Sequence, residues 1–143
     1  MNKILATVAF CSTIVLAAPV KAENPAHVKQ LLETYQCSSC DLSGADLTGA
    51  HLVGADLRNA NLQGATLIKA NLEGADLTGA NLKDANLTGA FVNGTSLKEA
   101  NLVSVNFSDA RLHHVNVSDA VMSDITLDGA TVHNTAISVG GGD

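Results

Sequence analysis

Large aromatic side chains are nearly absent from this sequence of 143 residues, which has no tryptophan, one tyrosine and three phenylalanines. Proline is also rare, with two residues. The hydrophobic fraction is nevertheless 46%, and only 15% of the residues are charged, so the composition excludes disorder driven by low hydrophobicity and high charge. Much of the hydrophobic fraction is alanine and leucine. The core must therefore be built from small, regular parts, and the length indicates one domain.

Basic side chains are scarce, with eight lysines and arginines against fourteen aspartates and glutamates. This balance excludes a strongly basic nucleic-acid binder. We expect no nucleic-acid partner, because an acidic protein repels phosphates and favours cationic partners.

Residues 1–22 have the features of a secretory signal peptide. A short basic start at Lys3 precedes an uncharged run of 15 residues from Ile4 to Ala18, and cleavage is expected after Ala22. The run is shorter than the ~20 residues of a membrane span, although an uncleaved anchor remains the alternative. Cys11 lies in this run without a lipobox before it. We therefore expect an exported protein with no stable membrane anchor after cleavage.

A period of five residues dominates the rest of the chain, as in Ala45-Asp46-Leu47-Thr48-Gly49 and Ala75-Asp76-Leu77-Thr78-Gly79. A large apolar residue recurs every five positions from Leu42 to Ile137, which makes 20 repeats, and fourteen of these centres are leucine. Two residues before each centre lies a small or aliphatic residue, which is alanine in fourteen repeats. Asp or Asn usually lies between the two.

This period fits neither a helix nor a long strand. A step of five advances a helix by 140° net, so the leucines would form no stripe, and a strand requires an even period. In a short strand followed by a corner, residues two apart face the same side, so Ala and Leu both point inward. Four corners close a coil of twenty residues. Twenty repeats then give five coils, stacked over roughly 24 Å at strand spacing.

The pattern resembles the pentapeptide-repeat family, whose signature is Ala-(Asp/Asn)-Leu followed by two variable residues. The resemblance implies an all-β fold, a right-handed quadrilateral β-helix of about five coils over residues 40–139, followed by a flexible tail over 140–143. It also implies leucines inside the coils beside alanines. Larger residues replace alanine in the C-terminal half and predict a slightly swollen or irregular region there: Thr95, Val105, Val115, Ile125 and Thr135.

A solenoid must cover its terminal coils. The segment 23–39 is expected to supply an N-terminal capping helix and a junction. Asn24 is a good N-cap, Pro25 a good first residue, and Val28, Leu31, Leu32 and Tyr35 follow at helical spacing, which predicts one amphipathic helix from Pro25 to Gln36. A free or partner-binding helix is the alternative.

No C-terminal cap is visible after Ile137. The last coil is therefore expected to be open and to permit self-association or contact with a partner. In the alternative interpretation, polar side chains solvate its edge: Thr131, Asn134, Thr135 and Ser138.

Cys37-Ser38-Ser39-Cys40 forms a C-x-x-C motif at the junction. Export favours a structural disulfide. A redox role would need a thioredoxin-like context, which is missing, and a metal site would need two more ligands nearby. Asp41 stands where attachment of a c-type haem requires histidine. The start Cys40-Asp41-Leu42-Ser43-Gly44-Ala45 is similar to that of exported cyanobacterial members of the family, which suggests the periplasm or the thylakoid lumen.

Stacking with a period of twenty aligns several unusual side chains on one face. One column contains His113 and His133, about 5 Å apart, and the neighbouring columns contain His114, Arg111 and an outward Phe91. An exposed Phe beside an Arg is typical of a small protein-contact patch, and paired imidazoles can bind Zn²⁺ or Cu²⁺. A solvated face that happens to be rich in histidine is favoured over a metal site, because two or three histidines without a carboxylate are incomplete.

Three classes of function follow. An exported binding or scaffold module with an unknown protein partner is favoured. A DNA mimic is the second, because some relatives are acidic rods that protect DNA gyrase from quinolones; a cytoplasmic location would favour it. Metal binding through His113 and His133 is the third. We expect no enzyme activity, no catalytic residues and no cofactor, since no nucleophile context or desolvated acid pair is visible.

Overall fold

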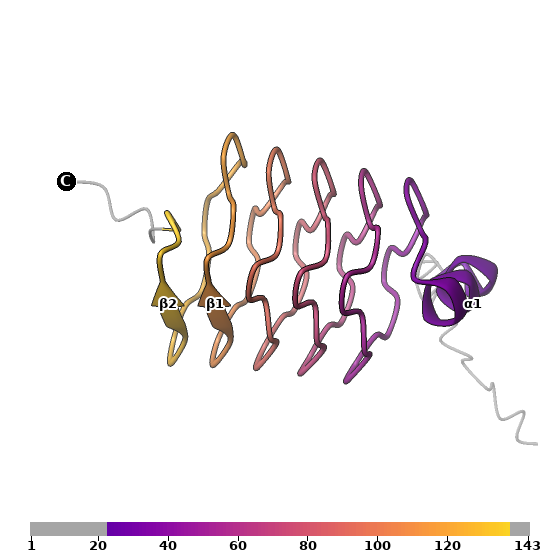
Figure 1. The fold of residues 1–143 in the computed structure, drawn as a ribbon, viewed down its shortest axis with the longest axis horizontal. Coiled ribbons are helices and arrows are strands. Elements are labelled where there is room, and N and C mark those ends of the chain that lie inside the picture. Colours follow the sequence, from indigo (N-terminus) through magenta and orange to yellow (C-terminus); the bar gives the residue numbers. More distant parts are fainter. Residues whose placement is uncertain (1–22, 138–143) are drawn as a thin grey trace, which may run out of the picture.

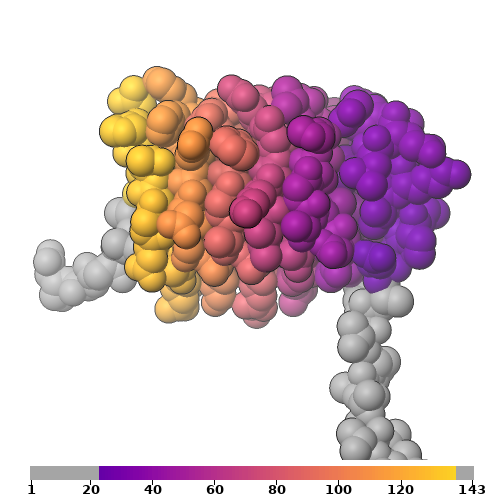
Figure 2. Space-filling model, turned by 90° about the horizontal axis from the view of Figure 1, so that it is seen from below, coloured from indigo at the N-terminus to yellow at the C-terminus, as the bar shows by residue number. Residues whose placement is uncertain are grey.

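The computed structural model describes residues 23–137. The predicted signal peptide at 1–22, the last two residues of the predicted repeat region at 138–139 and the predicted tail at 140–143 lie outside the described residues. The described part is a repeat solenoid whose coils stack side by side along its long axis, with α1 (Pro25–Thr34) at one end and β1 and β2 at the other (Figure 1). In the space-filling view the coils touch along the whole rod (Figure 2).

Parallel bridges between residues twenty apart hold the coils together, as at Asp41↔Asn61, Asn61↔Asn81 and Asn81↔Asn101. Each bridge is reinforced by backbone hydrogen bonds in both directions. Leu62 N–H donates to Asn81 O at 2.7 Å, and Asn81 N–H donates to Ala60 O at 2.9 Å. Twenty residues per coil is therefore the observed repeat, as the period of five residues and four corners predicts.

The corners explain why glycine, asparagine and aspartate recur after each centre. The residue two positions after the centre has a positive φ, such as +65° at Gly64 and +57° at Asn59. A left-handed residue at the third position of a four-residue turn is the type II geometry, which glycine and asparagine adopt at low cost. The preceding Asp or Asn supports the corner from its side chain: Asp76 Oδ1 accepts from Thr78 N–H at 3.0 Å and from the Thr78 hydroxyl at 2.6 Å.

Extended segments are shorter than the sequence predicts. Most units contribute one isolated bridge, and three-residue strands occur in the described part only at β1 (Arg111–His113) and β2 (Thr131–His133), which pair in parallel. The physical reason is the unit length, because a turn every five residues leaves little room for a longer strand.

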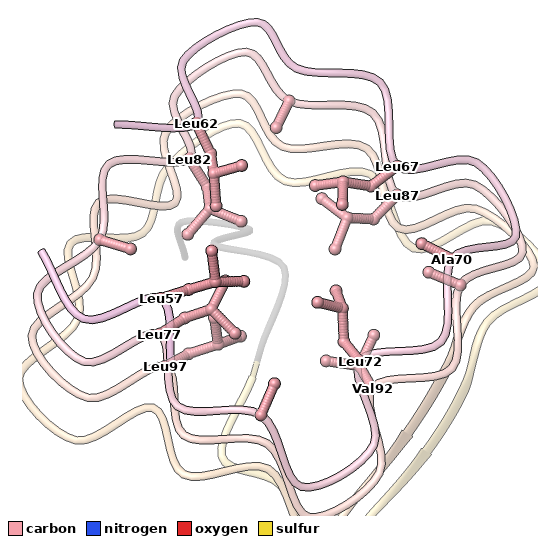
Figure 3. Close-up of a cluster of buried hydrophobic side chains, with 14 of the residues drawn as sticks. Leu57, Leu62, Leu67, Ala70, Leu72, Leu77, Leu82, Leu87, Val92 and Leu97 are labelled. Carbon is pink, nitrogen blue, oxygen red and sulfur yellow. The ribbon is translucent and has the colours of Figure 1, made fainter. Parts of the chain in front are cut away.

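Leucines fill the interior in vertical stacks. Leu57, Leu77 and Leu97 lie above one another on one side, and Leu62 and Leu82 on another, all pointing toward the axis (Figure 3). All five are at most 1% exposed. The small alanines at the corners, such as Ala70, allow the backbone to turn closely around this core (Figure 3).

The predicted irregularity of the C-terminal half is localised at its corners. Each of the fourteen alanines before a centre donates its N–H to the preceding centre's carbonyl at 2.9–3.1 Å. At Val105 this bond lengthens to 3.4 Å. At Thr95, Val115, Ile125 and Thr135 it is absent among the described residues. The Thr95 hydroxyl donates to Leu72 O at 2.7 Å, and Val115 N–H donates to the Thr135 hydroxyl at 3.1 Å. A β-branched side chain inside a corner therefore opens it.

The helix α1 begins as predicted and ends earlier. Asn24 Oδ1 accepts from Ala26 N–H at 3.1 Å and from His27 N–H at 3.4 Å. The end expected at about Gln36 is two residues late: the helix ends at Thr34, because Tyr35 turns left-handed with φ 58° and donates its N–H to Leu31 O.

Only two of the four residues predicted to form the apolar face of α1 pack against the core. Leu31 is fully buried and Val28 packs against the core, whereas Leu32 is 47% and Tyr35 43% exposed. The early helix end turns Tyr35 away from the first coil. Within residues 23–137 no helix is long and apolar enough to cross a bilayer.

The repeat begins one unit earlier than the predicted boundary at residue 40. Gln36 bridges Asp56, Cys37 N–H donates to Asp56 O at 2.8 Å, and Ser39 has the left-handed φ of a corner. Cys37 thus occupies a centre position below Leu57. Cysteine at this position hid the unit, because the repeat was identified from leucine and its analogues.

At the other end, no described residue covers the last coil. Met122, Ile125, Leu127 and Val132 are only partly buried there, and the outward Val121 is 59% exposed. Polar groups satisfy part of the edge, since the Thr135 hydroxyl donates to Leu112 O at 3.1 Å.

Candidate functional site

One side of the rod gathers the unusual side chains. We call it the histidine face and define it by the units centred on Leu52, Leu72, Val92, Leu112 and Val132. Parallel bridges align its first outward column as His51, Asn71, Phe91, Arg111 and Thr131. The register His113↔His133 aligns the next column. The sequence-predicted patch residues therefore lie together on this face, toward the end that carries β1 and β2 (Figure 1).

Phe91 and Arg111 form the first contact of this patch. Their backbones bridge directly, and the Arg111 guanidinium carbon lies 5.1 Å from the centroid of the Phe91 ring. This is cation–π geometry, which holds the charge over the ring face. Phe91 is half-buried and Arg111 is exposed, so the guanidinium keeps its hydrogen-bond donors directed at solvent.

His113 and His133 form the second contact. Their ring centroids are 4.9 Å apart and the rings are inclined by 71°, an edge-to-face arrangement. Asn93, one coil before His113, accepts a hydrogen bond at its Oδ1 from His113 N–H at 3.3 Å. His113 Nε2 is buried and finds no hydrogen-bond partner among the described residues. The pair is therefore placed by backbone register and ring packing.

His114 and His51 extend the face in two directions. His114 lies at the corner with φ 57°, and its Nε2 is 3.0 Å from Asn134 Nδ2. His51 is exposed at the foot of the first column. It was missing from the predicted patch, although its spacing of forty residues from Phe91 was visible in the sequence.

The metal-binding chemistry of this site is limited. A tetrahedral zinc site takes four ligands, and His113 and His133 supply two. Within residues 23–137 no group of three or more His, Cys, Asp or Glu side chains converges to hold a metal ion. The arrangement offers a partial site at most.

The cysteines form a separate structural feature. Cys37 and Cys40 are joined by a disulfide, with Cα atoms 5.2 Å apart. Both are inward residues, 0% and 5% exposed, and they flank the first corner. Next to them Asp41 N–H donates to His27 Nδ1 at 2.9 Å, which ties α1 to the first coil. Burial of both sulfurs fits a clip that closes the end of the core and disfavours exchange with a substrate.

Two carboxyl groups within residues 23–137 have a lowered pKa. The guanidinium of Arg58, bound to Asp56 Oδ2 at 2.6 Å, holds the pKa of the Asp56 carboxyl below its ordinary value. A hydrogen bond from Thr48 lowers the pKa of Asp46 in the same way. Both shifts favour the ionised form on the surface. A general acid would require the opposite shift, produced by burial.

Comparisons with known proteins agree with the repeat geometry. A family model for pentapeptide repeats matches residues 40–79 in eight copies, and a model for the pentapeptide repeat region matches residues 65–137. Among curated proteins, none matches the chain.

Solved structures similar to this chain include two pentapeptide repeat proteins. The pentapeptide repeat protein Rfr23 from the cyanobacterium Cyanothece 51142 has a TM-score of 0.63 and 24% identity, covering 78% of this chain and 92% of its own. A pentapeptide repeat protein from the thylakoid lumen of Arabidopsis thaliana has a TM-score of 0.54 and 30% identity, covering 74% of this chain and 68% of its own. With the five-residue units, the corners and the stacked leucines, these matches lead to one conclusion: the chain belongs to the pentapeptide repeat family.

Proposed function

We propose that this chain is an exported, non-enzymatic binding module that contacts a protein partner through the histidine face. Its scaffold is a right-handed, four-sided β-helix of about five coils, capped by α1. The observation that carries the proposal is the outward-facing patch of Phe91, Arg111, His113, His114 and His133, in which Phe91 and His113 are half-buried and the other three are exposed. Within it the Arg111 guanidinium is held over the Phe91 ring. Arginine and aromatic side chains are enriched at protein interfaces.

The interior supports a binding role over catalysis. The core is filled by leucine and alanine, most of it 0% exposed, and the described acids lie on the outside of the coils. Function is therefore assigned to the outer surface, where side chains vary without changing the fold.

Three observations support export to the periplasm or the thylakoid lumen, two from the sequence and the comparisons and one from the disulfide. The first is the predicted signal peptide at residues 1–22, and the second is the relative from a thylakoid lumen. The buried disulfide between Cys37 and Cys40 is typical of an oxidising compartment. Sequencing the N-terminus of the protein from its source cell tests this: Glu23 as first residue supports export, and an intact Met1 in the cytoplasm contradicts it.

Affinity capture from the exported fraction tests the binding role. The baits are the wild-type protein, the variant Phe91→Ala/Arg111→Ala/His113→Ala, and a control with Gln63→Ala/Lys83→Ala on the opposite side of the rod. We expect a protein that is captured by the wild type and the control and lost with the patch variant. Circular dichroism of all three verifies folding. Equal capture by all three baits contradicts the proposal.

The open end is a second proposed contact, for self-association. Val121 is 59% exposed beside the partly buried Met122 and Leu127, and an uncovered coil presents unpaired backbone groups. Sedimentation velocity from micromolar to millimolar protein tests it. Concentration-dependent dimers that Val121→Lys abolishes support the proposal, and a strict monomer at every concentration contradicts it.

A further inference from the structure

Charge is distributed unevenly around the rod. Four of the five histidines in the chain lie on the histidine face, and its described units contain a single carboxylate, Glu73, and a single basic side chain, Arg111. The other three faces each carry more carboxylates than basic side chains: Asp41, Asp84 and Asp124 against Lys83; Asp46, Asp109 and Asp128 against Lys69; Asp56, Asp76, Glu99 and Asp119 against Arg58 and Lys98. The histidine face is thus the neutral side of an acidic rod, and it is the side on which protonation adds positive charge.

The two arginines differ in whether they form ion pairs within the described part of the protein. Arg58 Nη2 lies 2.6 Å from Asp56 Oδ2, and Arg58 Nε lies 3.9 Å from Asp76 Oδ2. Arg111 has no ion-pair partner among the described residues and is held over Phe91 instead. A guanidinium fixed on a ring with free donors is preorganised for a carboxylate from outside the molecule.

The histidines add a dependence on protons. Histidine is the side chain whose charge normally changes between pH 5 and 8. His113 lies on β1 with Arg111, His114 lies at the corner that follows β1, and His133 lies on β2, near the end of the rod (Figure 1). Two imidazolium rings with centroids 4.9 Å apart repel each other, and an anion placed against them relieves that repulsion.

The charged groups around this cluster leave it open to an anion. Glu73 lies in the same column as the histidine pair. Asn93 occupies the position between Glu73 and His113, so the two are two coils apart. Lys69 and Asp109 lie at the corner that leads into the face. Asp56 and Asp76 begin the next face, where both contact Arg58. No described carboxylate contacts Arg111, His113 or His133.

From this charge complementarity we infer that the histidine face docks an acidic protein segment, through Arg111 at all pH values and more tightly as His113, His114 and His133 become protonated. This inference rests on the proposed binding function and specifies its partner chemistry and its regulation.

Fluorescence anisotropy with a labelled peptide of ten aspartates tests it at low salt. The peptide is ionised at both pH 5.5 and pH 8.0, so the protein alone changes charge between them. We expect binding about tenfold tighter at pH 5.5, since two or three added charges on this face each contribute modestly. The variant His113→Gln/His133→Gln should lose most of this pH dependence and keep its affinity at pH 8.0.

Arg111→Ala should weaken binding at both pH values, whereas Arg58→Ala, which removes the same charge from an adjacent face, should not. Equal affinity at both pH values, or equal losses in the two arginine variants, overturns the inference. Equally tight binding of a ten-residue oligothymidylate, lost in the same variants, overturns the assignment to an acidic protein segment. A captured partner that needs the patch, combined with no peptide binding, leaves the proposed function standing and removes the acidic chemistry.

Discussion

At the N-terminal end of the rod, α1 places the fully buried Leu31 on the first coil, a disulfide closes the first corner and His27 accepts from Asp41 N–H. At the C-terminal end most apolar residues of the last described coil are only partly buried. Four corners of the C-terminal half lack the usual turn bond among the described residues, at Thr95, Val115, Ile125 and Thr135. The repeat is nearly the same at both ends. Cooperative stability in such a rod depends on neighbours above and below each coil. The end at which no described residue covers the last coil should therefore be the least stable part.

The two halves of the rod also differ in the residues that stabilise the fold and those that we propose for binding. The covered half has the regular leucine and alanine interior, and its described outward arginine is engaged by Asp56. The open half has the irregular corners and the cluster of Arg111, His113 and His133. The cluster that we propose as the binding site therefore lies where the repeat is least regular.

Leucine truncations should reveal the largest difference between the two regions. Leu77 is 0% exposed in the middle of the rod, and Leu77→Ala should cost about 3–4 kcal/mol of unfolding free energy, within the range for buried leucines. Leu127 in the last coil is partly buried, and Leu127→Ala should cost about half as much because part of its surface is already hydrated. Urea denaturation followed by circular dichroism measures both. Equal losses for the two variants would contradict weaker packing in the last described coil.

Removing the clip should weaken the covered end. Cys37→Ala/Cys40→Ala should lower stability by about 2 kcal/mol, since a loop of four residues gives a smaller entropic gain than a long loop. Reduction of the wild-type protein with dithiothreitol provides the matched measurement by thermal melting. An unchanged melting temperature after both treatments would show that α1 alone secures this end.

Replacing a corner glycine by alanine should have different effects in an inner coil and in the last described coil. Gly79 and Gly129 have φ of +69° and +70°, and a Cβ at either would press on a side-chain oxygen of the coil before it, from Asn59 or Asp109 respectively. Gly79→Ala should cost about 1–2 kcal/mol from left-handed strain and crowding. Gly129→Ala should cost less, because the last coil can relax. Thermal melts measure both, and a larger loss at Gly129 would contradict a pliable end.

The smallest expected effect is on acid stability. Arg58 lowers the pKa of Asp56, so the folded state favours the ionised carboxyl and binds fewer protons than the unfolded state. The resulting stability is present above the ordinary aspartate pKa and is lost as pH falls through the lowered folded value. Melting temperatures of the wild type and Asp56→Asn should differ at pH 6, and the difference should shrink as the pH falls below the ordinary aspartate pKa and through the lowered folded pKa. A constant difference would contradict this linkage.

The sequence predicted the repeat well because the period is encoded in every unit. Twenty residues per coil, inward leucines and the columns containing Phe91, Arg111, His113 and His133 all follow from spacing, and the bridges have that register. Features determined by packing in three dimensions could not be predicted in the same way. The end of α1 at Thr34 depends on the chain entering the first coil at Gln36, and the exposure of Leu32 and Tyr35 follows from that turn.

The site shows the same division. Columns predict which side chains are neighbours, but the stacking of Arg111 on Phe91 and the inclined imidazoles depend on rotamers that the sequence does not encode locally. The early first unit at Cys37 was hidden because a half-cystine replaced the usual leucine at its centre. Its Gln36↔Asp56 bridge becomes visible only when the coils are stacked.

Amide hydrogen exchange resolved by NMR tests the difference between the covered and open ends most directly. Leu97, Leu102 and Phe107 donate their N–H groups to the next coil at 2.7–2.8 Å, whereas the amides of Val117, Met122 and Leu127 have no acceptor among the described residues. We predict that the first three exchange slowly, through global unfolding, and that the last three exchange orders of magnitude faster, by local fraying. Uniformly slow exchange across all six amides would contradict an open C-terminal end.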